Sequence, residues 1–178
     1  MIQNFDPNKQ SGFRAPSWGL RWRTWLTIGI LLASAGTARG DSADVTIPTS
    51  VSFFVTDVSL STTGTPNPST ASFTDAVLTS GNALRMSIQA DATNFTRPVE
   101  AGGSIPATNL SWTISGATNG QGFAGTLSAT GYTKVYESNP DATSGSVNLT
   151  WSLAAPGATV RAGAHTLIAT WKLESVVP

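Results

Sequence analysis

The clearest pattern along the chain is an alternation of large apolar and small polar residues in a six-residue segment that occurs three times. The segment reads Asn-Leu-Ser-Trp-Thr-Ile at 109–114, Asn-Leu-Thr-Trp-Ser-Leu at 148–153 and, more loosely, Ile-Ala-Thr-Trp-Lys-Leu at 168–173. Successive side chains of an extended chain point to opposite sides, so the apolar residues of each copy share one side. Each of these tryptophan segments therefore predicts a strand with one buried face.

Further alternating segments fill most of the chain after residue 43. In the cleanest one, Leu84, Met86 and Ile88 are predicted to face inward and the polar residues Arg85, Ser87 and Gln89 to face solvent. Weaker strand patterns lie at 44–47, 51–60, 71–79, 123–129, 132–138 and 164–173. Clusters of Gly, Pro, Asn and Ser separate them, and no segment shows sustained helical periodicity. The pattern predicts an all-β fold, a single antiparallel β-sandwich of about eight or nine strands with immunoglobulin-like or jelly-roll-like connections.

The longest irregular connection runs from 91 to 108. It contains Pro98, Gly102, Gly103 and Pro106, which interrupt any strand pattern. Connections longer than about 12 to 15 residues in a compact domain are often functional. We therefore expect this connection to be the binding loop, if the protein uses a loop for binding.

The first 40 residues differ from the rest and predict a secretory signal peptide. A basic region that ends with Arg-Trp-Arg at 21–23 precedes an apolar run at 25–35, and small residues follow. The apolar run has about 11 residues, whereas a membrane-spanning helix needs roughly 20. We expect cleavage after Gly40 or after Ala38. The β-sandwich domain, 41–178, would then be secreted or held at the cell surface, in the periplasm or outside the cell, and would not span a membrane.

Composition narrows the classes of partner. The chain of 178 residues has 10 basic and 10 acidic residues and no cysteine. Because residues 1–40 hold five of the basic residues and one of the acidic ones, residues 41–178 hold five basic and nine acidic residues, a net charge near −4. An acidic domain offers no electrostatic basis for binding nucleic acid. Without disulfides, the stability of the domain must come from its core and its strand ladders.

The sequence offers little material for catalysis or metal binding. His165 is the only histidine, no Gly-x-Ser-x-Gly motif precedes it, and we expect it to be a partly exposed strand residue. A zinc site would need several such ligands. Asp141, in the turn at 139–145, could contribute to a calcium site, but an Asx-turn is the simpler expectation. The sequence therefore predicts a non-enzymatic protein without cofactor or metal.

The aromatic residues allow two interpretations. Trp112, Trp151 and Trp171 could form a platform for sugar rings, but they alternate in phase with aliphatic residues, which favours a place in the core. Tyr132 and Tyr136 share a phase of their own near turns. These two tyrosines are our candidates for an exposed aromatic contact with a ligand.

The C-terminal third carries two segments that resemble a known family. They read Leu-Thr-Trp-Ser-Leu-Ala-Ala-Pro at 149–156 and Ala-Gly-Ala-His-Thr-Leu-Ile-Ala-Thr-Trp-Lys-Leu at 162–173. They resemble the Trp-x-Leu repeats and the Ala-Gly-x-Tyr strand entry of bacterial WxL-type surface domains, and similar entries occur in fimbrial-type secreted β-sandwiches. The resemblance implies a non-catalytic domain of a cell surface or an appendage.

These observations predict an exported, non-catalytic surface, extracellular-matrix or pilus-like protein with a structural or adhesive role. Such a protein would contact other copies of itself or other surface proteins through strand edges, or polysaccharide. The alternative is a carbohydrate-binding module that uses exposed aromatic residues.

Overall fold

The computed structural model describes residues 40–98 and 102–178, which form two antiparallel sheets packed face to face. The larger sheet has the order β1-β3-β9-β5-β7, with β2 also paired to β9, and the smaller sheet has the order β10-β4-β8-β6. The larger sheet contains β1 (Ser42–Thr46), β2 (Thr62–Thr63), β3 (Ser69–Val77), β5 (Leu110–Thr118), β7 (Gly125–Thr126) and β9 (Gly145–Leu153). The smaller sheet contains β4 (Ala83–Ala90), β6 (Gly120–Gly122), β8 (Thr133–Ser138) and β10 (Ala169–Val176). A single 3-10 turn, η1 (Ala107–Asn109), precedes β5 in the described part of the chain.

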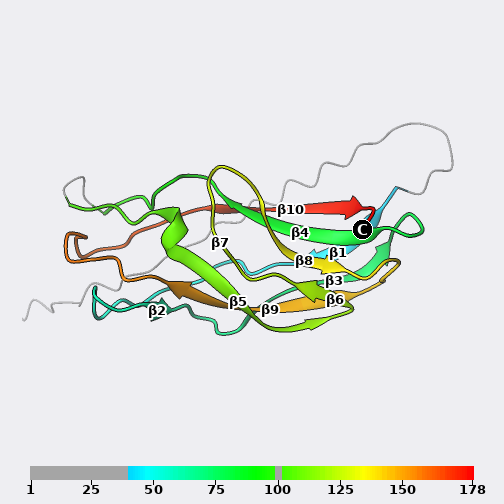
Figure 1. The fold of residues 1–178 in the computed structure, drawn as a ribbon, viewed down its shortest axis with the longest axis horizontal. Coiled ribbons are helices and arrows are strands. Elements are labelled where there is room, and N and C mark those ends of the chain that lie inside the picture. The colour runs from blue at the N-terminus through cyan, green and yellow to red at the C-terminus, as the bar shows by residue number, and fades with distance from the viewer. Residues whose placement is uncertain (1–39, 99–101) are drawn as a thin grey trace, which may run out of the picture.

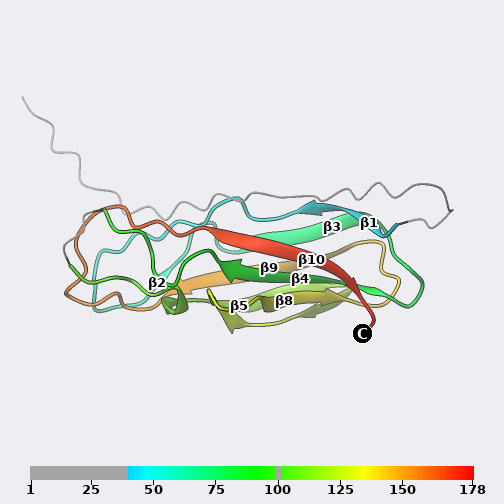
Figure 2. The same cartoon turned by 90° about the horizontal axis from the view of Figure 1, so that it is seen from above.

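The two layers confirm the predicted antiparallel β-sandwich. Figure 1 shows them from the side, with β10 and β4 in the upper layer and β9 and β5 in the lower. Figure 2 looks down on the smaller sheet, where β10, β4 and β8 run side by side. The predicted signal peptide, except for Gly40, lies outside the described residues.

Several predicted strands have other limits in the structure. The segment 51–60 forms no ladder, and Ser52 makes a single bridge to Thr65. Its side chains nevertheless alternate, since Phe53 is buried in the core while Phe54 is 62% exposed. The last predicted strand, 164–173, begins later, at Ala169, and the pattern at 123–129 yields only the two residues of β7. Alternation of apolar residues thus predicts correctly which residues of this segment are buried. Whether the segment forms a hydrogen-bonded strand depends on a partner strand alongside.

The first two tryptophan segments form β5 and β9, which pair with each other at the centre of the larger sheet. Trp112 lies directly opposite Trp151, and the two ring centroids are 5.3 Å apart at a tilt of 56°. On the other side of β5, Gly125 is the partner of Trp112, and a Cβ atom at that glycine would lie 2.7 Å from the indole ring. A side chain there would displace the tryptophan, so the space beside Trp112 requires glycine.

The buried aromatic residues have partners for their polar atoms. Trp112 Nε1 donates to the carbonyl oxygen of Phe123 at 2.8 Å, and Trp151 Nε1 donates to the hydroxyl of Ser69 at 2.6 Å. Both indoles are at most 2% exposed, and Trp171 in β10 is 8% exposed. Their place in the core is confirmed. Because a buried N–H without a partner is costly, these bonds allow large indoles to be buried without that cost.

Truncating Trp151 should strongly destabilise the domain. Trp151→Ala removes a buried indole and leaves a cavity, which should lower the free energy of unfolding by about 3–5 kcal/mol. Thr113→Ala, on the outer side of β5, should change it by less than about 1 kcal/mol. Urea and thermal unfolding of both variants measure the difference, and a Trp151→Ala protein as stable as the wild type would contradict this account of the core.

Candidate functional site

His165 lies inside the end of the sandwich. It is 5% exposed and precedes β10, and its Nε2 atom lies 3.0 Å from the carbonyl oxygen of Arg161. The expectation of a partly exposed strand residue is therefore wrong. The reason is that the loop packs against the long connection: Thr166 pairs with Thr96, and Pro98 fills the space above Gly163, whose φ is +141°.

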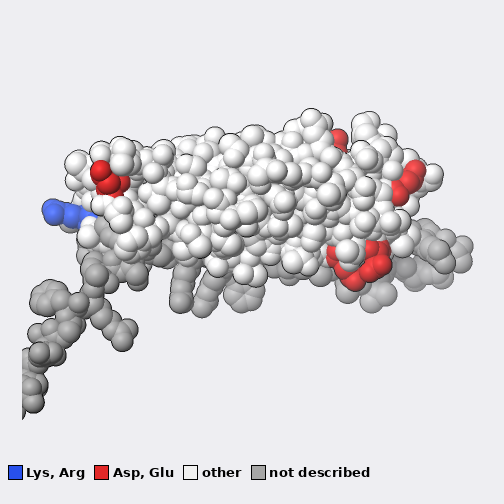
Figure 3. Space-filling model, turned by 90° about the horizontal axis from the view of Figure 1, so that it is seen from below, with Lys and Arg blue, Asp and Glu red and all other residues white. Residues whose placement is uncertain are grey.

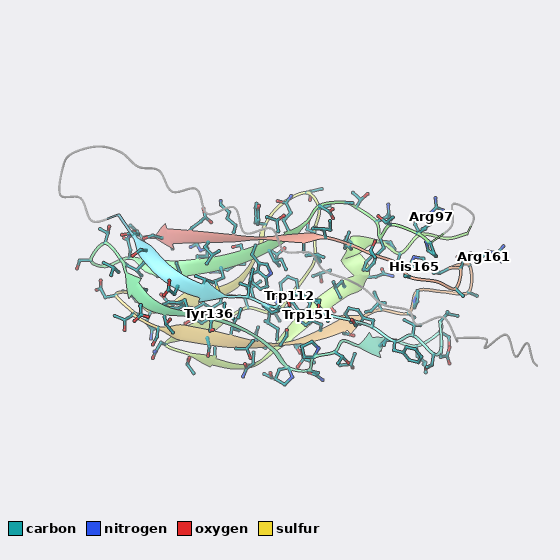
Figure 4. The ribbon with its side chains drawn as sticks, turned by 180° about the vertical axis from the view of Figure 1, so that it is seen from behind. Arg97, Trp112, Tyr136, Trp151, Arg161 and His165 are labelled. Carbon is teal, nitrogen blue, oxygen red and sulfur yellow. The ribbon has the colours of Figure 1, made fainter. Side chains whose placement is uncertain are left out.

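The long connection itself is built into this end of the fold. Asn94 pairs with Pro106, and Phe95 and Ile105 are almost fully buried. Arg97 donates to the carbonyl oxygen of Gly102 at 2.8 Å. Figure 4 shows Arg97, Arg161 and His165 together at this end, far from Tyr136. The use of this connection as a binding loop stays a prediction.

Two carboxylates of the described chain, those of Asp41 and Asp141, accept hydrogen bonds from turns. No group of three or more His, Cys, Asp or Glu residues in the described ranges is placed to hold a metal ion. Asp141, which has a φ of +57°, accepts a hydrogen bond from the backbone N–H of Gly81 at 2.8 Å. Asp41 likewise accepts from the backbone N–H of Thr79 at 2.6 Å, and hydrogen bonds from Ser175 and Thr79 hold the pKa of Asp41 below its usual range. These bonds join neighbouring turns at the end of the sandwich opposite to His165.

Tyr136 is not an exposed contact, so this part of the tyrosine prediction is wrong. It is fully buried, its hydroxyl donates to the carbonyl oxygen of Thr118 at 2.7 Å, and burial raises its pKa to about 12. The cause is a bulge in β8: Met86 pairs with Tyr136, but the next residue of β4, Ser87, pairs with Lys134. The extra residue, Val135, reverses the alternation, so that Tyr136 points inward.

Tyr132 remains a candidate ligand contact. Its side chain is 44% exposed, just before β8. Lys172 Nζ of β10 lies 5.5 Å from the centroid of its ring, within the range of a cation–π contact. The loop before it is anchored to β4, because Ser128 accepts a hydrogen bond from Ala90 and Ala129 accepts one from Gln89. The exposed ring is therefore held over the outer side of the smaller sheet.

The outer face of the smaller sheet carries an array of charges, which we call the charged face. It consists of Arg85, Lys134, Glu137, Lys172 and Glu174. The register places Glu174, Arg85 and Glu137 in one row across β10, β4 and β8, and the two lysines in the next row on either side of Ser87. Ser87, predicted to face solvent, is only 4% exposed, since long lysine side chains on both sides shield a short one.

Arg85 and Glu137 form the ion pair of the charged face that is most shielded from solvent. Arg85 Nε donates to Glu137 Oε2 at 2.7 Å, and Lys134 Nζ lies 3.4 Å from the same oxygen. The hydrogen bond from Arg85, with the nearby charge of Lys134, holds the pKa of Glu137 below its ordinary value. Lys134 Nζ also lies 3.8 Å from the ring centroid of Phe123. These contacts keep the charged side chains of β4 and β8 in fixed positions.

The outer face of the larger sheet is different, and we call it the hydroxyl face. On β3, β5 and β9 we define it by ten outward residues: Thr70, Ser72, Thr74, Ser111, Thr113, Ser115, Ser146, Asn148, Thr150 and Ser152. Neighbouring side chains bond to one another: Thr70 donates to Asn148 Oδ1 at 2.8 Å, and Thr150 donates to Asn67 Oδ1 at 3.0 Å. Figure 3 looks onto this side of the molecule, where charged side chains lie near the two ends and the middle is uncharged.

No protein-family model matches the chain, and no curated protein matches it. The resemblance to WxL-type and fimbrial-type domains stays a prediction. The described residues also contain no helix with the length and apolar character to cross a membrane. Function must therefore be argued from the two outer faces and the strand edges.

Sequence reasoning missed the charged face as a unit. Arg85, Glu137 and Glu174 come from three strands that are far apart in the chain, and only the register of the smaller sheet makes them neighbours. A signal was present for Arg85, which stands between Leu84 and Met86, whereas Glu137 and Glu174 are each followed by a serine. Alternation assigns a residue to a face, but it does not say which strands adjoin.

The Arg85–Glu137 pair should make stability depend on acid. Because folding lowers the pKa of Glu137, the ionised carboxylate stabilises the fold above its ordinary pKa, and this contribution is lost as pH falls through the lower, folded value. Between about pH 7 and about pH 3, Glu137→Gln should therefore lose less stability than the wild type. Since both side chains are partly exposed, the difference should be at most about 1 kcal/mol. Urea unfolding at a series of pH values measures this difference. If the free energy of unfolding falls equally with pH in both proteins, the role of this pair is contradicted.

Proposed function

We propose that the chain is an exported, non-catalytic β-sandwich protein with a structural or adhesive role at a cell surface, in an extracellular matrix or in a pilus-like assembly. The observation that carries the proposal is the hydroxyl face. It presents ten short, uncharged side chains on three adjacent strands, with no lysine or glutamate to project from it. Its central strands β5 and β9 carry no charge that would repel a neighbouring surface, and the face keeps hydrogen-bonding groups available to that neighbour. The exposed Asp44 of β1 lies at the edge, opposite Thr74.

The lateral bonds within the hydroxyl face support this role. Because Thr70 and Thr150 are held by the side chains of Asn148 and Asn67, little side-chain freedom remains to be lost when a neighbour packs there. The signal-peptide pattern of residues 1–40 and the lack of cysteine complete the argument for an exported domain stabilised by its core.

Strand edges offer a second kind of contact with neighbours. β10 pairs with β4 over eight residues without a register shift, and it lies at the end of the strand order of the smaller sheet. The other terminal strands are short, since β6 has three residues and β7 two, and β1 is interrupted by a shift near Asp44. Short or irregular edges resist pairing with another sheet, whereas a long regular edge favours it. β10 is therefore the edge best suited to contact another protein.

Fractionation of cells that express the full-length gene tests the proposed location. We expect the mature protein in the surface, periplasmic or extracellular fraction, beginning at Arg39 or Asp41 when its N-terminus is sequenced. A protein that stays in the cytoplasm with residues 1–40 intact would overturn the proposal. A signal-blocked variant with Leu31→Arg and Leu32→Arg serves as the control for retention, because charge disrupts the apolar region that secretion requires.

Carbohydrate binding is the second candidate function, and one observation favours it. Tyr132 presents an exposed aromatic ring beside Lys172, over a face that contains both donors and acceptors. An aromatic ring can hold the apolar face of a sugar while polar side chains bind its hydroxyl groups.

Polysaccharide pull-down with the purified protein tests this second function. Tyr132→Ala should abolish binding and leave the melting temperature nearly unchanged, because the residue is 44% exposed and is not part of the hydrophobic core. Phe54→Ala is the matched control, since Phe54 is 62% exposed and lies outside the charged face. Equal loss in both variants, or no saturable binding by the wild type, would contradict a sugar site at Tyr132.

A further inference from the structure

We propose that the charged face binds an acidic polysaccharide, with Tyr132 holding a uronic acid ring and Lys172 binding its carboxylate. This inference rests on the carbohydrate-binding function proposed above and names its ligand class. Three observations carry it: the position of Lys172 beside the exposed ring, the sign of the charge on this face, and the exposure to solvent of the ion pair that Lys172 forms with Glu174.

The geometry pairs an apolar surface with a cation. Lys172 Nζ is 5.5 Å from the ring centroid of Tyr132, although Lys172 lies in β10 and Tyr132 just before β8, with β4 between these two strands. A pyranose ring held against Tyr132 would bring a carboxylate on that ring within reach of the ammonium group. The ammonium can donate three hydrogen bonds, and bonds between charged groups are the stronger kind. A uronate meets both requirements, whereas a neutral sugar uses only the ring.

The charge of the face differs from that of the rest of the molecule. Three basic and two acidic residues make up the charged face, a net charge of +1. The remaining described residues carry two basic and six acidic side chains, a net charge of −4: Arg97, Arg161, Asp41, Asp44, Asp57, Asp75, Asp91 and Asp141. An acidic polymer is therefore repelled by most of the molecule and attracted to this face.

Lys172 is available to exchange its partner. Its ammonium lies 2.6 Å from Glu174 Oε1, but the side chains are 46% and 34% exposed. An ion pair exposed to this degree contributes little to stability, so a ligand carboxylate can replace that of Glu174 without disturbing the fold. The side chain of Lys134 is less exposed, at 35%, and its ammonium lies 3.8 Å from the ring centroid of Phe123, over which it is already placed. The structure thus points to Lys172, rather than Lys134, as the cation that meets the ligand.

The decisive experiment compares one polymer in two charge states. The full-length gene is expressed, the product is purified as it accumulates, and its binding to polygalacturonate and to fully methyl-esterified polygalacturonate is measured by titration calorimetry. We expect binding to the acidic polymer alone, and we expect it to weaken with added salt. Lys172→Gln should reduce the affinity about tenfold, because it removes one charge-assisted bond. Glu174→Gln should increase the affinity, because it removes the competing carboxylate.

Matched variants distinguish binding at Lys172 from non-specific attraction of the acidic polymer to any basic side chain. Arg161→Gln removes the same charge at the end of the sandwich and should leave binding unchanged (Figure 4). Tyr132→Leu should lose binding, while Tyr132→Phe should keep it, and thermal melts of each variant confirm that it is folded. If Arg161→Gln weakens binding as much as Lys172→Gln, the proposed site is wrong.

The outcomes also separate this inference from the proposals on which it depends. Equal binding to both polymers, unaffected by Lys172→Gln, would overturn the proposed preference for an acidic polysaccharide. The proposal of carbohydrate binding at Tyr132 would still stand. Failure to bind these polymers and a panel of neutral polysaccharides would overturn both. Neither result bears on the exported structural role, which the fractionation experiment decides.

Discussion

Trp112 and Trp151 meet at the centre of the larger sheet, and the rest of the sandwich depends on this contact. Their rings lie 5.3 Å apart between the two layers, and each N–H has an acceptor inside the fold. Two indoles of this size can be buried side by side only if the adjoining strand has no side chain in the same space. Gly125 meets this requirement beside Trp112. The pairing also fixes the register of β5 on β9, and through it the side to which every neighbouring residue points.

Once the register is fixed, the two outer faces acquire different chemistry. The residues between the apolar positions of β5 and β9 are serine, threonine and asparagine, so the larger sheet presents hydroxyl and amide groups to its surroundings. The strands of the smaller sheet have arginine, lysine and glutamate at the same kind of position. One molecule thus combines a neutral surface suited to packing against a neighbour with a charged surface suited to a ligand. The adhesive role that we propose would use both surfaces, one for the protein's own assembly and the other for a target.

The bulge in β8 is a small irregularity with a large effect on the charged face. In a regular strand, Lys134 and Tyr136 would share one side and Glu137 would point to the other. The additional residue, Val135, turns Tyr136 into the core and leaves both Lys134 and Glu137 on the outside. The salt bridge from Arg85 to Glu137 exists only because of this reversal. The bulge therefore brings Lys134 and Glu137 together on the charged face, and it places Tyr136 in the core.

The sequence by itself determined the fold class and the core, because burial of one face imposes a period of two on any strand. The inward positions of Trp112, Trp151 and Trp171 and of the apolar residues of β4 were readable from that period alone. The pattern did not decide which strands are neighbours, so the rows of the charged face could not be foreseen. It also could not place Tyr136, since a bulge is a property of the pairing between two strands. Nor could the pattern predict the burial of His165, which results from the packing of two loops that are distant in the chain. Local alternation is encoded residue by residue, whereas neighbours across a sheet and between loops exist only in the folded molecule.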